Sequence, residues 1–296
     1  MKELGRLLTA MVTPFDEKGA VDYEQAKRLA TALLDSGSDG VVVAATTGEA
    51  PTLTWEEEMR LFTEVKSAIG NRGTIVAYTG SNSTTEAVEA TRGAEKIGVD
   101  ACLLVVPYYN KPSQEGIYQH FKNVAESTSL PIIMYNIPSR VVVNMTVDTI
   151  VRLSQIDNII GVKEASGNME HVAQTLNNAR EDFLIWSGND SDTFPIMALG
   201  GYGVIGVVTH LVGQQVREMM GDILKNDVHA AATIHRHLLP LVNSLFIVSN
   251  PAPVKYALNH LGFRVGKPRL PLVEPDEKTA ATIRETLKNY RIDLPV

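Results

Sequence analysis

The sequence contains the stretch Ile159-Ile160-Gly161-Val162-Lys163-Glu164-Ala165-Ser166-Gly167. Its first four residues are apolar or glycine, which is typical of a strand buried on both faces. Lowering the pKa of a buried lysine from about 10.4 to 7–8 costs about 3–5 kcal/mol, and the product is a neutral amine that attacks carbonyl groups. Lys163 is therefore either such a nucleophile or an ordinary lysine at the wet end of the strand beside Glu164.

Apolar, strand-like runs alternate with amphipathic helical patterns on both sides of this stretch. Eight strand-then-helix units with short connections predict an α/β fold, a parallel (β/α)8 barrel of the TIM type, rather than an open sheet. The predicted strands are 7–15, 40–46, 74–79, 101–107, 131–135, the Lys163 stretch, 183–186 and 204–208. Between them the sequence predicts helices at 23–36, 83–97, 114–127 and 169–180. It also predicts a helix capped by Thr54 and Glu57, a helix capped by Thr146, and a short helix that ends near residue 199.

Strand patterns stop after the eighth predicted strand, and four helical patterns follow at 215–225, 228–246, 253–261 and 276–290. This tail is too long to be the last helix of a barrel. We therefore expect a catalytic barrel over residues 1–222 and a C-terminal α-helical domain over residues 223–296.

The composition excludes several classes of protein. The net charge of −7 argues against nucleic acid as the main partner, which would need a basic face. No apolar run reaches the length of a membrane span, and residues 1–6 lack the features of a signal peptide. The single cysteine, Cys102, fits a reducing compartment. We expect a cytoplasmic protein without a membrane partner, and the motifs typical of phosphate loops and metal sites are missing from the sequence.

A set of mostly polar residues stands at the carboxyl ends of the predicted strands, which meet at the reactive face of such barrels. These residues are Thr46, Thr47, Tyr108, Tyr109, Tyr135, Arg140, Lys163, Ser187, Gly188, Ile205 and Thr209. A lysine, phenols, hydroxyl groups and one guanidinium suit carbonyl chemistry on an anionic substrate. No carboxylate pair for glycoside hydrolysis is evident among them.

The demands of that chemistry suggest a role for five of these residues. Lys163 would condense with a keto acid, and the resulting iminium would act as an electron sink. The Tyr135 hydroxyl could give and take protons, and Thr46 could pass them on. Thr47 could hold one carboxylate, and Arg140 could clamp a second one bidentately. The alternatives are that Tyr135 is a core aromatic and that Arg140 is a surface ion-pair partner.

Four motifs resemble the pyruvate-dependent class I aldolase family, which includes N-acetylneuraminate lyase and dihydrodipicolinate synthase. They are 45–49 (Ala-Thr-Thr-Gly-Glu), 107–112 (Pro-Tyr-Tyr-Asn-Lys-Pro), 135–140 (Tyr-Asn-Ile-Pro-Ser-Arg) and 161–165 (Gly-Val-Lys-Glu-Ala). The resemblance spans the whole chain. It is closest to the members that condense pyruvate with L-aspartate 4-semialdehyde in the diaminopimelate route to lysine. It implies a homotetramer, built as a dimer of tight dimers, with no metal or organic cofactor.

The resemblance also implies roles for individual residues. Lys163 would form the Schiff base with pyruvate, and Tyr135 would be the general acid and base. Thr46 would link Tyr135 to Tyr109 of a neighbouring subunit in a proton relay. The residues implied in substrate binding are Thr47 and Ile205 for the pyruvate carboxylate, Arg140 for the semialdehyde, and Gly188.

The chain departs from the family pattern around the substrate site. Ala45 stands where glycine is usual, and Val141-Val142 stands where a Thr-Gly pair is usual. The alternative activity, cleavage of sialic acid or of a keto-deoxy-sugar acid, would need this loop to bind a polyol, and the two valines offer no hydroxyl group. A second alternative is a binding barrel without catalysis, but such a protein has no need for both Lys163 and Tyr135.

A lysine-feedback pocket is only half present. Asn82, Glu86 and Tyr108 match the pocket of family members that lysine inhibits, whereas Trp55 and Glu58 replace histidines. We therefore expect a possible allosteric lysine site with weak or no inhibition.

Overall fold

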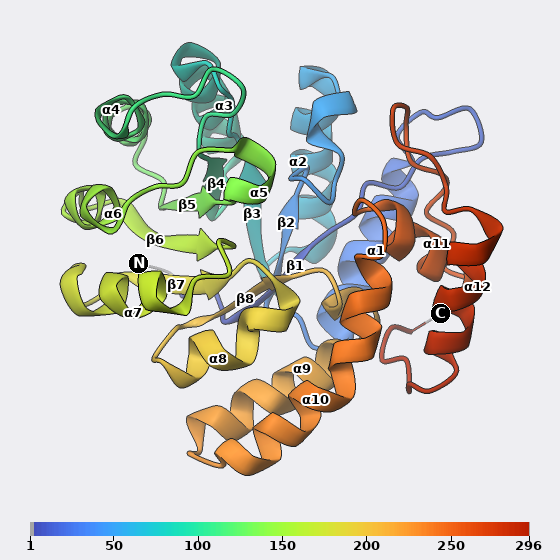
Figure 1. Cartoon of the computed structure of the whole chain (residues 1–296). Helices are drawn as coiled ribbons and strands as arrows, with labels where there is room; N and C mark the ends of the chain where they lie inside the picture. The colour runs from blue at the N-terminus through green and yellow to red at the C-terminus, as the bar shows by residue number, and fades with distance from the viewer. Residues whose placement is uncertain (1–2, 296) are drawn as a thin grey trace. The chain divides into compact units, whose positions relative to one another are not determined.

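The computed structural model describes residues 3–295, whose eight strands form a closed barrel in chain order (Figure 1). The strands are β1 (Leu7–Ala10), β2 (Gly40–Val43), β3 (Thr74–Tyr78), β4 (Ala101–Val105), β5 (Ile132–Asn136), β6 (Ile159–Glu164), β7 (Leu184–Ser187) and β8 (Gly203–Gly206). Neighbouring strands pair in parallel, as in β5 with β6 and β6 with β7. The predicted (β/α)8 fold is confirmed.

Most of the strands are shorter than the sequence predicts. The first was expected to reach residue 15 and ends at Ala10, and the second was expected to reach residue 46 and ends at Val43. Ala44 has a φ of 56°, and a residue in this left-handed region cannot continue a strand. The residues after Val43 therefore form a turn, which carries Thr46 and Thr47.

The chain forms two compact units. Unit 1 comprises residues 3–6 and 76–205, and unit 2 comprises residues 7–75 and 206–295. These limits differ from the expected boundary at residue 222, so the division into a barrel over 1–222 and a helical domain over 223–296 stays a prediction.

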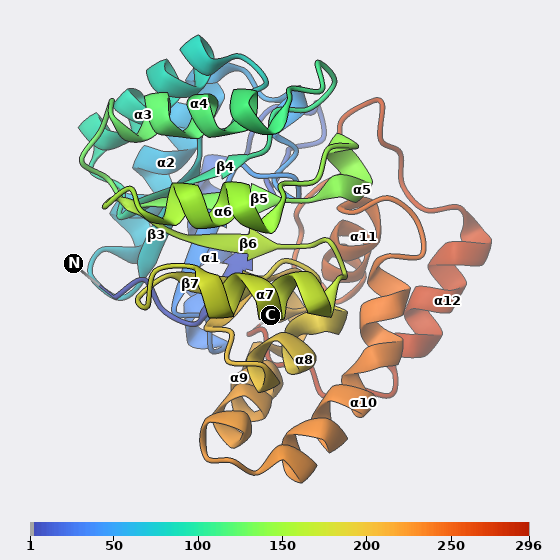
Figure 2. The same ribbon diagram turned by 60° about the vertical axis from the view of Figure 1, so that its left-hand side comes forward.

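The helices of unit 1 are α3 (Thr84–Ile97), α4 (Gln114–Ala125), α5 (Pro138–Val141), α6 (Val147–Ser154), α7 (Met169–Asn178) and α8 (Thr193–Ala198), with a 3₁₀ turn at Asp190–Asp192. The longer helices lie on the outer side of β4 to β7, whereas the single turn α5 lies past the end of β5 (Figure 1). Figure 2 shows α4, α6 and α7 side by side. The predicted cap of α6 is confirmed, because the Thr146 hydroxyl accepts from the Thr149 N–H.

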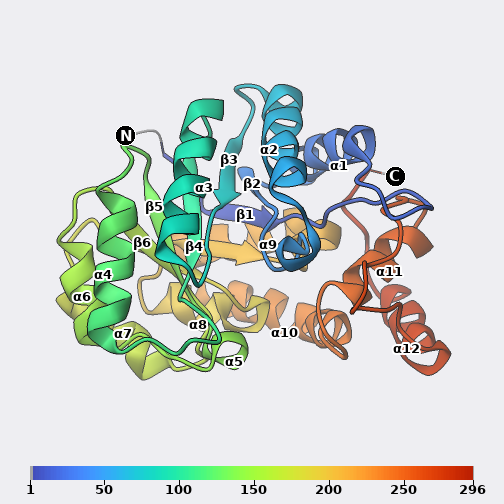
Figure 3. The ribbon, with the colours of Figure 1, turned by 90° about the horizontal axis from the view of Figure 1, so that it is seen from above.

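In unit 2, α1 packs against α2, and α11 packs against α12 (Figure 3). The helices are α1 (Tyr23–Asp35), α2 (Trp55–Ile69), α9 (Thr209–Leu224), α10 (Val228–Leu245), α11 (Ala252–His260) and α12 (Glu277–Leu287), with a 3₁₀ turn at Ala50–Thr52. The capping box of Thr54 and Glu57 is present as predicted. A search of residues 3–295 finds no helix that could cross a membrane.

Candidate active site

Lys163 and Tyr135 lie on adjacent strands of the barrel. Tyr135 of β5 pairs in register with Lys163 of β6, and Lys163 pairs with Trp186 of β7. Register partners on parallel strands point to the same face. The Lys163 Nζ lies 4.2 Å from the centroid of the Tyr135 ring, and both side chains are buried. The structure therefore brings together the predicted nucleophile and the predicted proton carrier.

The environment of Lys163 favours its neutral form. Only 4% of its surface is exposed. Burial lowers the pKa of Lys163 to about 7, and the positive charge of Arg140 lowers it further, whereas the negative charge of Asp190 opposes the change. A substantial fraction of the Lys163 amine is therefore neutral near pH 7. The alternative of a solvent-facing lysine beside Glu164 is therefore wrong.

Gly188 leaves space beside the Lys163 side chain. The Gly188 N–H donates to the Glu164 carbonyl at 2.7 Å, which fixes the backbone there. A Cβ atom at this position would lie 3.1 Å from the Lys163 Cγ and 2.8 Å from the Ala165 Cβ. Any larger residue would crowd the nucleophile, which agrees with the predicted role of Gly188 near substrate.

A buried polar network holds the ends of β5 and β6 together. The Asn136 Nδ2 donates to both carboxylate oxygens of Glu164, at 3.0 and 3.3 Å, and to the Asn144 side chain at 2.8 Å. Asn136 directly follows Tyr135, and Glu164 directly follows Lys163. The network therefore fixes the backbone next to the two reactive side chains, a function that the sequence did not reveal.

Arg140 and Ile205 occupy different kinds of position in unit 1. Arg140 is exposed on α5, a single turn that begins at Pro138 and that the sequence analysis missed. Val142 ends this helix with a φ of 70°, an uncommon conformation for a β-branched residue. Ile205 is fully buried in β8.

The residues after β4 form an exposed group. Tyr109 is 90% exposed with a φ of 72°, and Tyr108 is 38% exposed. The Asn82 side chain donates to the Tyr108 carbonyl at 3.1 Å, and Glu86 accepts from the Ser81 hydroxyl at 2.7 Å. Asn82 and Tyr108 thus lie together, and the Tyr109 side chain is exposed to solvent in the single chain.

Thr46 and Thr47 lie in the turn after β2, in unit 2. Thr47 is buried, and its Oγ1 accepts a hydrogen bond from the Asn250 Nδ2 at 2.9 Å. The Thr13 hydroxyl donates to the Gly48 carbonyl at 2.6 Å. Because Lys163 belongs to unit 1, a site that combines it with the two threonines stays a prediction.

An ion-pair cluster anchors the end of this turn. Glu49 and Lys255 are both buried, and their Oε1 and Nζ atoms lie 2.6 Å apart. The other Glu49 oxygen accepts from the Arg269 N–H at 2.8 Å, and the Arg269 guanidinium binds Glu57. Glu49 itself has a φ of 61°, so the cluster also stabilises an uncommon backbone conformation.

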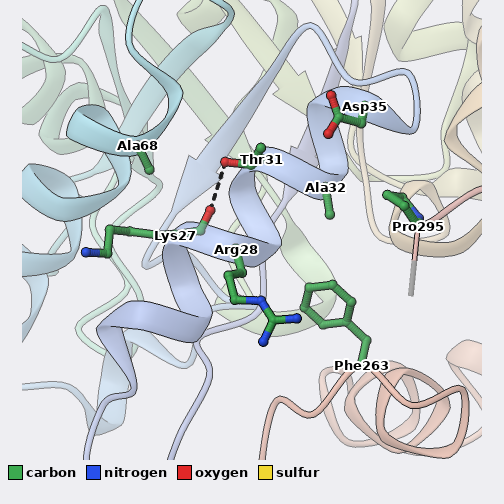
Figure 4. A pocket seen from close by; sticks show the side chains of 8 residues that line it. All are labelled: Lys27, Arg28, Thr31, Ala32, Asp35, Ala68, Phe263 and Pro295. Carbon is green, nitrogen blue, oxygen red and sulfur yellow. Dashed lines mark hydrogen bonds between the residues drawn. The ribbon is translucent and has the colours of Figure 1, made fainter.

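A surface cavity of about 340 Å³ lies elsewhere in unit 2 (Figure 4). It is lined by Lys27, Arg28, Thr31, Ala32, Asp35, Ala68, Phe263 and Pro295. Figure 4 shows the Thr31 hydroxyl bonded to the Lys27 carbonyl, at 3.1 Å. The Lys27 ammonium pairs with Glu24 and Glu64. The cavity contains no predicted catalytic residue, and the hydrogen bond to Glu24 raises the pKa of Lys27 and keeps this amine charged.

A buried lysine of near-neutral pKa beside a tyrosine, on adjacent strands of a (β/α)8 barrel, defines a candidate enzyme of the Schiff-base-forming class. The model of the dihydrodipicolinate synthetase family matches residues 3–290. The chain therefore belongs to the dihydrodipicolinate synthetase family.

Individual relatives agree with this assignment. The 4-hydroxy-tetrahydrodipicolinate synthase of Dehalococcoides mccartyi is 65% identical, over 100% of both chains. The dihydrodipicolinate synthase of Cyanidioschyzon merolae, solved with lysine bound, is 43% identical with a TM-score of 0.95, covering 97% of this chain and 98% of its own. The chloride-inhibited enzyme of Acinetobacter baumannii, solved with pyruvate, is 38% identical with a TM-score of 0.94, covering 97% of this chain and 99% of its own.

Proposed function

We propose that the chain condenses pyruvate with L-aspartate 4-semialdehyde to give 4-hydroxy-tetrahydrodipicolinate and water, through a Schiff base on Lys163. The observation that carries this proposal is the buried Lys163 amine, whose pKa of about 7 provides a neutral nucleophile, next to Tyr135. The name of the relative from Dehalococcoides mccartyi and the pyruvate complex of the Acinetobacter baumannii enzyme support the choice of substrates.

The proposed reaction begins when the Lys163 amine attacks the keto carbon of pyruvate. Loss of water gives an iminium, and loss of a methyl proton from it gives an enamine. The Tyr135 hydroxyl transfers protons in these steps. The enamine carbon then bonds to the aldehyde carbon of the semialdehyde. The substrate amine finally displaces Lys163 and closes the ring, so that one water is released overall.

The remaining site residues complete the proposal. Thr47 and the backbone at Ile205 bind the pyruvate carboxylate, Arg140 binds the semialdehyde carboxylate, and Gly188 lies against the bound substrate. Thr46 connects Tyr135 to the proton relay. The relay ends at Tyr109 of a neighbouring subunit, and the exposure of Tyr109 in the single chain supports this part. The enzyme would be a cytoplasmic homotetramer, a dimer of tight dimers.

The Schiff base is tested by borohydride reduction with pyruvate followed by mass spectrometry. The wild type should gain one pyruvate-sized adduct, and Lys163→Ala should gain none. Lys267→Ala, at an exposed lysine paired with Glu274, is the matched control and should label like the wild type. An adduct that persists in folded Lys163→Ala would refute the role of Lys163.

The second substrate is tested by offering different aldehydes to the pyruvate-loaded enzyme. L-aspartate 4-semialdehyde should be consumed, and sugar aldehydes should not. Val142 is 70% exposed beside Arg140 and offers no hydroxyl group to a polyol, which agrees with the synthase reaction rather than with the sugar-acid lyase alternative. Faster turnover of a sugar aldehyde would reverse the assignment.

Inhibition by lysine is expected to be weak or missing. Asn82, Glu86 and Tyr108 would supply part of an allosteric site, but Trp55 and Glu58 replace the histidines of inhibited family members. Burial raises the pKa of Glu58 to about 8, which disfavours the carboxylate form that would attract a lysine ammonium. Titration of the activity with lysine tests this proposal, and saturable inhibition at millimolar lysine would contradict it.

A further inference from the structure

Asn250 is a buried residue of the segment between α10 and α11. It lies 203 residues from Thr47 in the sequence, yet its Nδ2 donates to the Thr47 Oγ1 at 2.9 Å. Asn250 is 5% exposed and Thr47 is 3% exposed. The hydrogen bond is therefore shielded from water, which strengthens it and fixes its geometry.

The polarity of this bond constrains the Thr47 hydroxyl proton. An amide NH₂ group only donates, whereas a hydroxyl has one proton and two acceptor lone pairs. Because Thr47 accepts from Asn250, its own proton points away from Asn250. A carboxylate only accepts, so it needs a hydroxyl in this orientation.

We propose that Asn250 is a positioning residue, which orients the Thr47 hydroxyl so that it donates to the substrate carboxylate. This proposal rests on the proposed role of Thr47 in pyruvate binding. It gives the C-terminal segment a part in substrate affinity, although Asn250 itself need not touch the substrate.

Other contacts hold the Thr47 turn in place independently of Asn250. The Thr13 hydroxyl donates to the Gly48 carbonyl, and the buried Lys255 binds Glu49. Replacing Asn250 should therefore change the direction of the Thr47 hydroxyl more than the position of the turn. The effect should appear in pyruvate binding rather than in general loss of structure.

The first test compares Asn250→Ala and Asn250→Asp with the wild type. A new carboxylate at position 250 would accept the Thr47 proton and reverse the bond. We expect Asn250→Asp to raise the KM for pyruvate and the pyruvate concentration for half-maximal borohydride labelling by about tenfold to a hundredfold, the range for hydrogen bonds to charged groups. Asn250→Ala should have a smaller effect, and kcat and the KM for semialdehyde should change little in both variants.

The second test asks whether Asn250 acts through Thr47. In a Thr47→Val background, Asn250→Ala should change the KM for pyruvate by less than about twofold, because the hydroxyl that it orients is gone. Asn259→Ala is the matched control: this tail asparagine donates to the Gly266 carbonyl and accepts from the Val265 N–H, so its loss should lower Tm without changing the KM for pyruvate.

Three results would overturn the proposal. They are an unchanged KM for pyruvate in both Asn250 variants, full additivity with Thr47→Val, and an equal rise of KM in Asn259→Ala. Each of these can occur while the wild type still forms the Lys163 adduct, which separates failure of this inference from failure of the proposed function. The isosteric Asn250→Asp and the smaller Asn250→Ala give two independent chances of a folded variant, and Tm reports folding in each.

Discussion

The rate of Schiff-base formation should follow the ionisation of Lys163. Its pKa of about 7 lies well below the ordinary 10.5, which corresponds to roughly 5 kcal/mol against the charged form. Near pH 7 a substantial fraction of the Lys163 amine is therefore neutral, against about one part in three thousand for an ordinary lysine. Because only the neutral amine attacks a carbonyl, the rate should rise with pH and level off above the pKa of Lys163.

The assay is single-turnover borohydride trapping at subsaturating pyruvate, measured from about pH 5.5 to 9.5. The midpoint should lie near pH 7 in the wild type. Arg140→Met removes a positive charge that lowers the pKa of Lys163, so the midpoint should rise. Asp190→Asn removes a negative charge that raises this pKa, so the midpoint should fall. A wild-type rate that still increases tenfold per pH unit above pH 9 would refute the argument.

The remaining predictions concern stability and packing. Between pH 7 and 10.5 the unfolded chain binds more protons at Lys163 than the folded chain does, so the buried lysine destabilises the fold in this range. The Lys163→Met variant should therefore be more stable than the wild type at pH 7, by up to about 4 kcal/mol. Thermal unfolding at several pH values should show this difference shrinking toward pH 10. Gly188→Ala places a Cβ atom 3.1 Å from the Lys163 Cγ, so it should slow formation of the pyruvate adduct by about tenfold or more. An unchanged rate of adduct formation would show that the added methyl group does not crowd Lys163. Lys255→Met leaves the buried Glu49 without its ion-pair partner and should cost about 3–5 kcal/mol in denaturant unfolding. Val142→Gly relieves a φ of 70° at an exposed position and should raise the free energy of unfolding by about 1 kcal/mol, whereas a lower Tm would show that Val142 is not strained.

The sequence predicts the barrel because each strand is a short buried run followed by an amphipathic helix. The sequence does not predict where each strand ends, because the strand ends depend on backbone φ and ψ angles. Ala44 has no sequence signal for its φ of 56°, so the second strand was expected to continue to Thr46. The helix at Pro138–Val141 was missed because a single turn is too short to show helical periodicity.

The candidate site shows a similar limit. Lys163, Tyr135 and Gly188 were predicted as site residues because each stands at or next to the end of a strand, and the barrel makes those ends converge. The proposed role of Asn250 could not be predicted in this way, because its bond to Thr47 joins residues 203 positions apart. Such long-range polar contacts depend on tertiary packing, and no local pattern encodes them.

Lys163 and Lys255 are both buried, and together they show why a lowered pKa alone does not identify a nucleophile. Burial lowers the pKa of Lys255 to about 8 and that of Lys163 to about 7, so by this criterion both are candidates. The Lys255 ammonium, however, donates to the Glu49 carboxylate at 2.6 Å and to the Lys267 carbonyl at 3.2 Å. These bonds use its protons and favour its charged form at pH 7, so Lys255 stabilises the fold. The Lys163 amine lies over the Tyr135 ring at the end of a barrel strand, where loss of its proton yields a nucleophile. The contacts of each amine therefore decide its role.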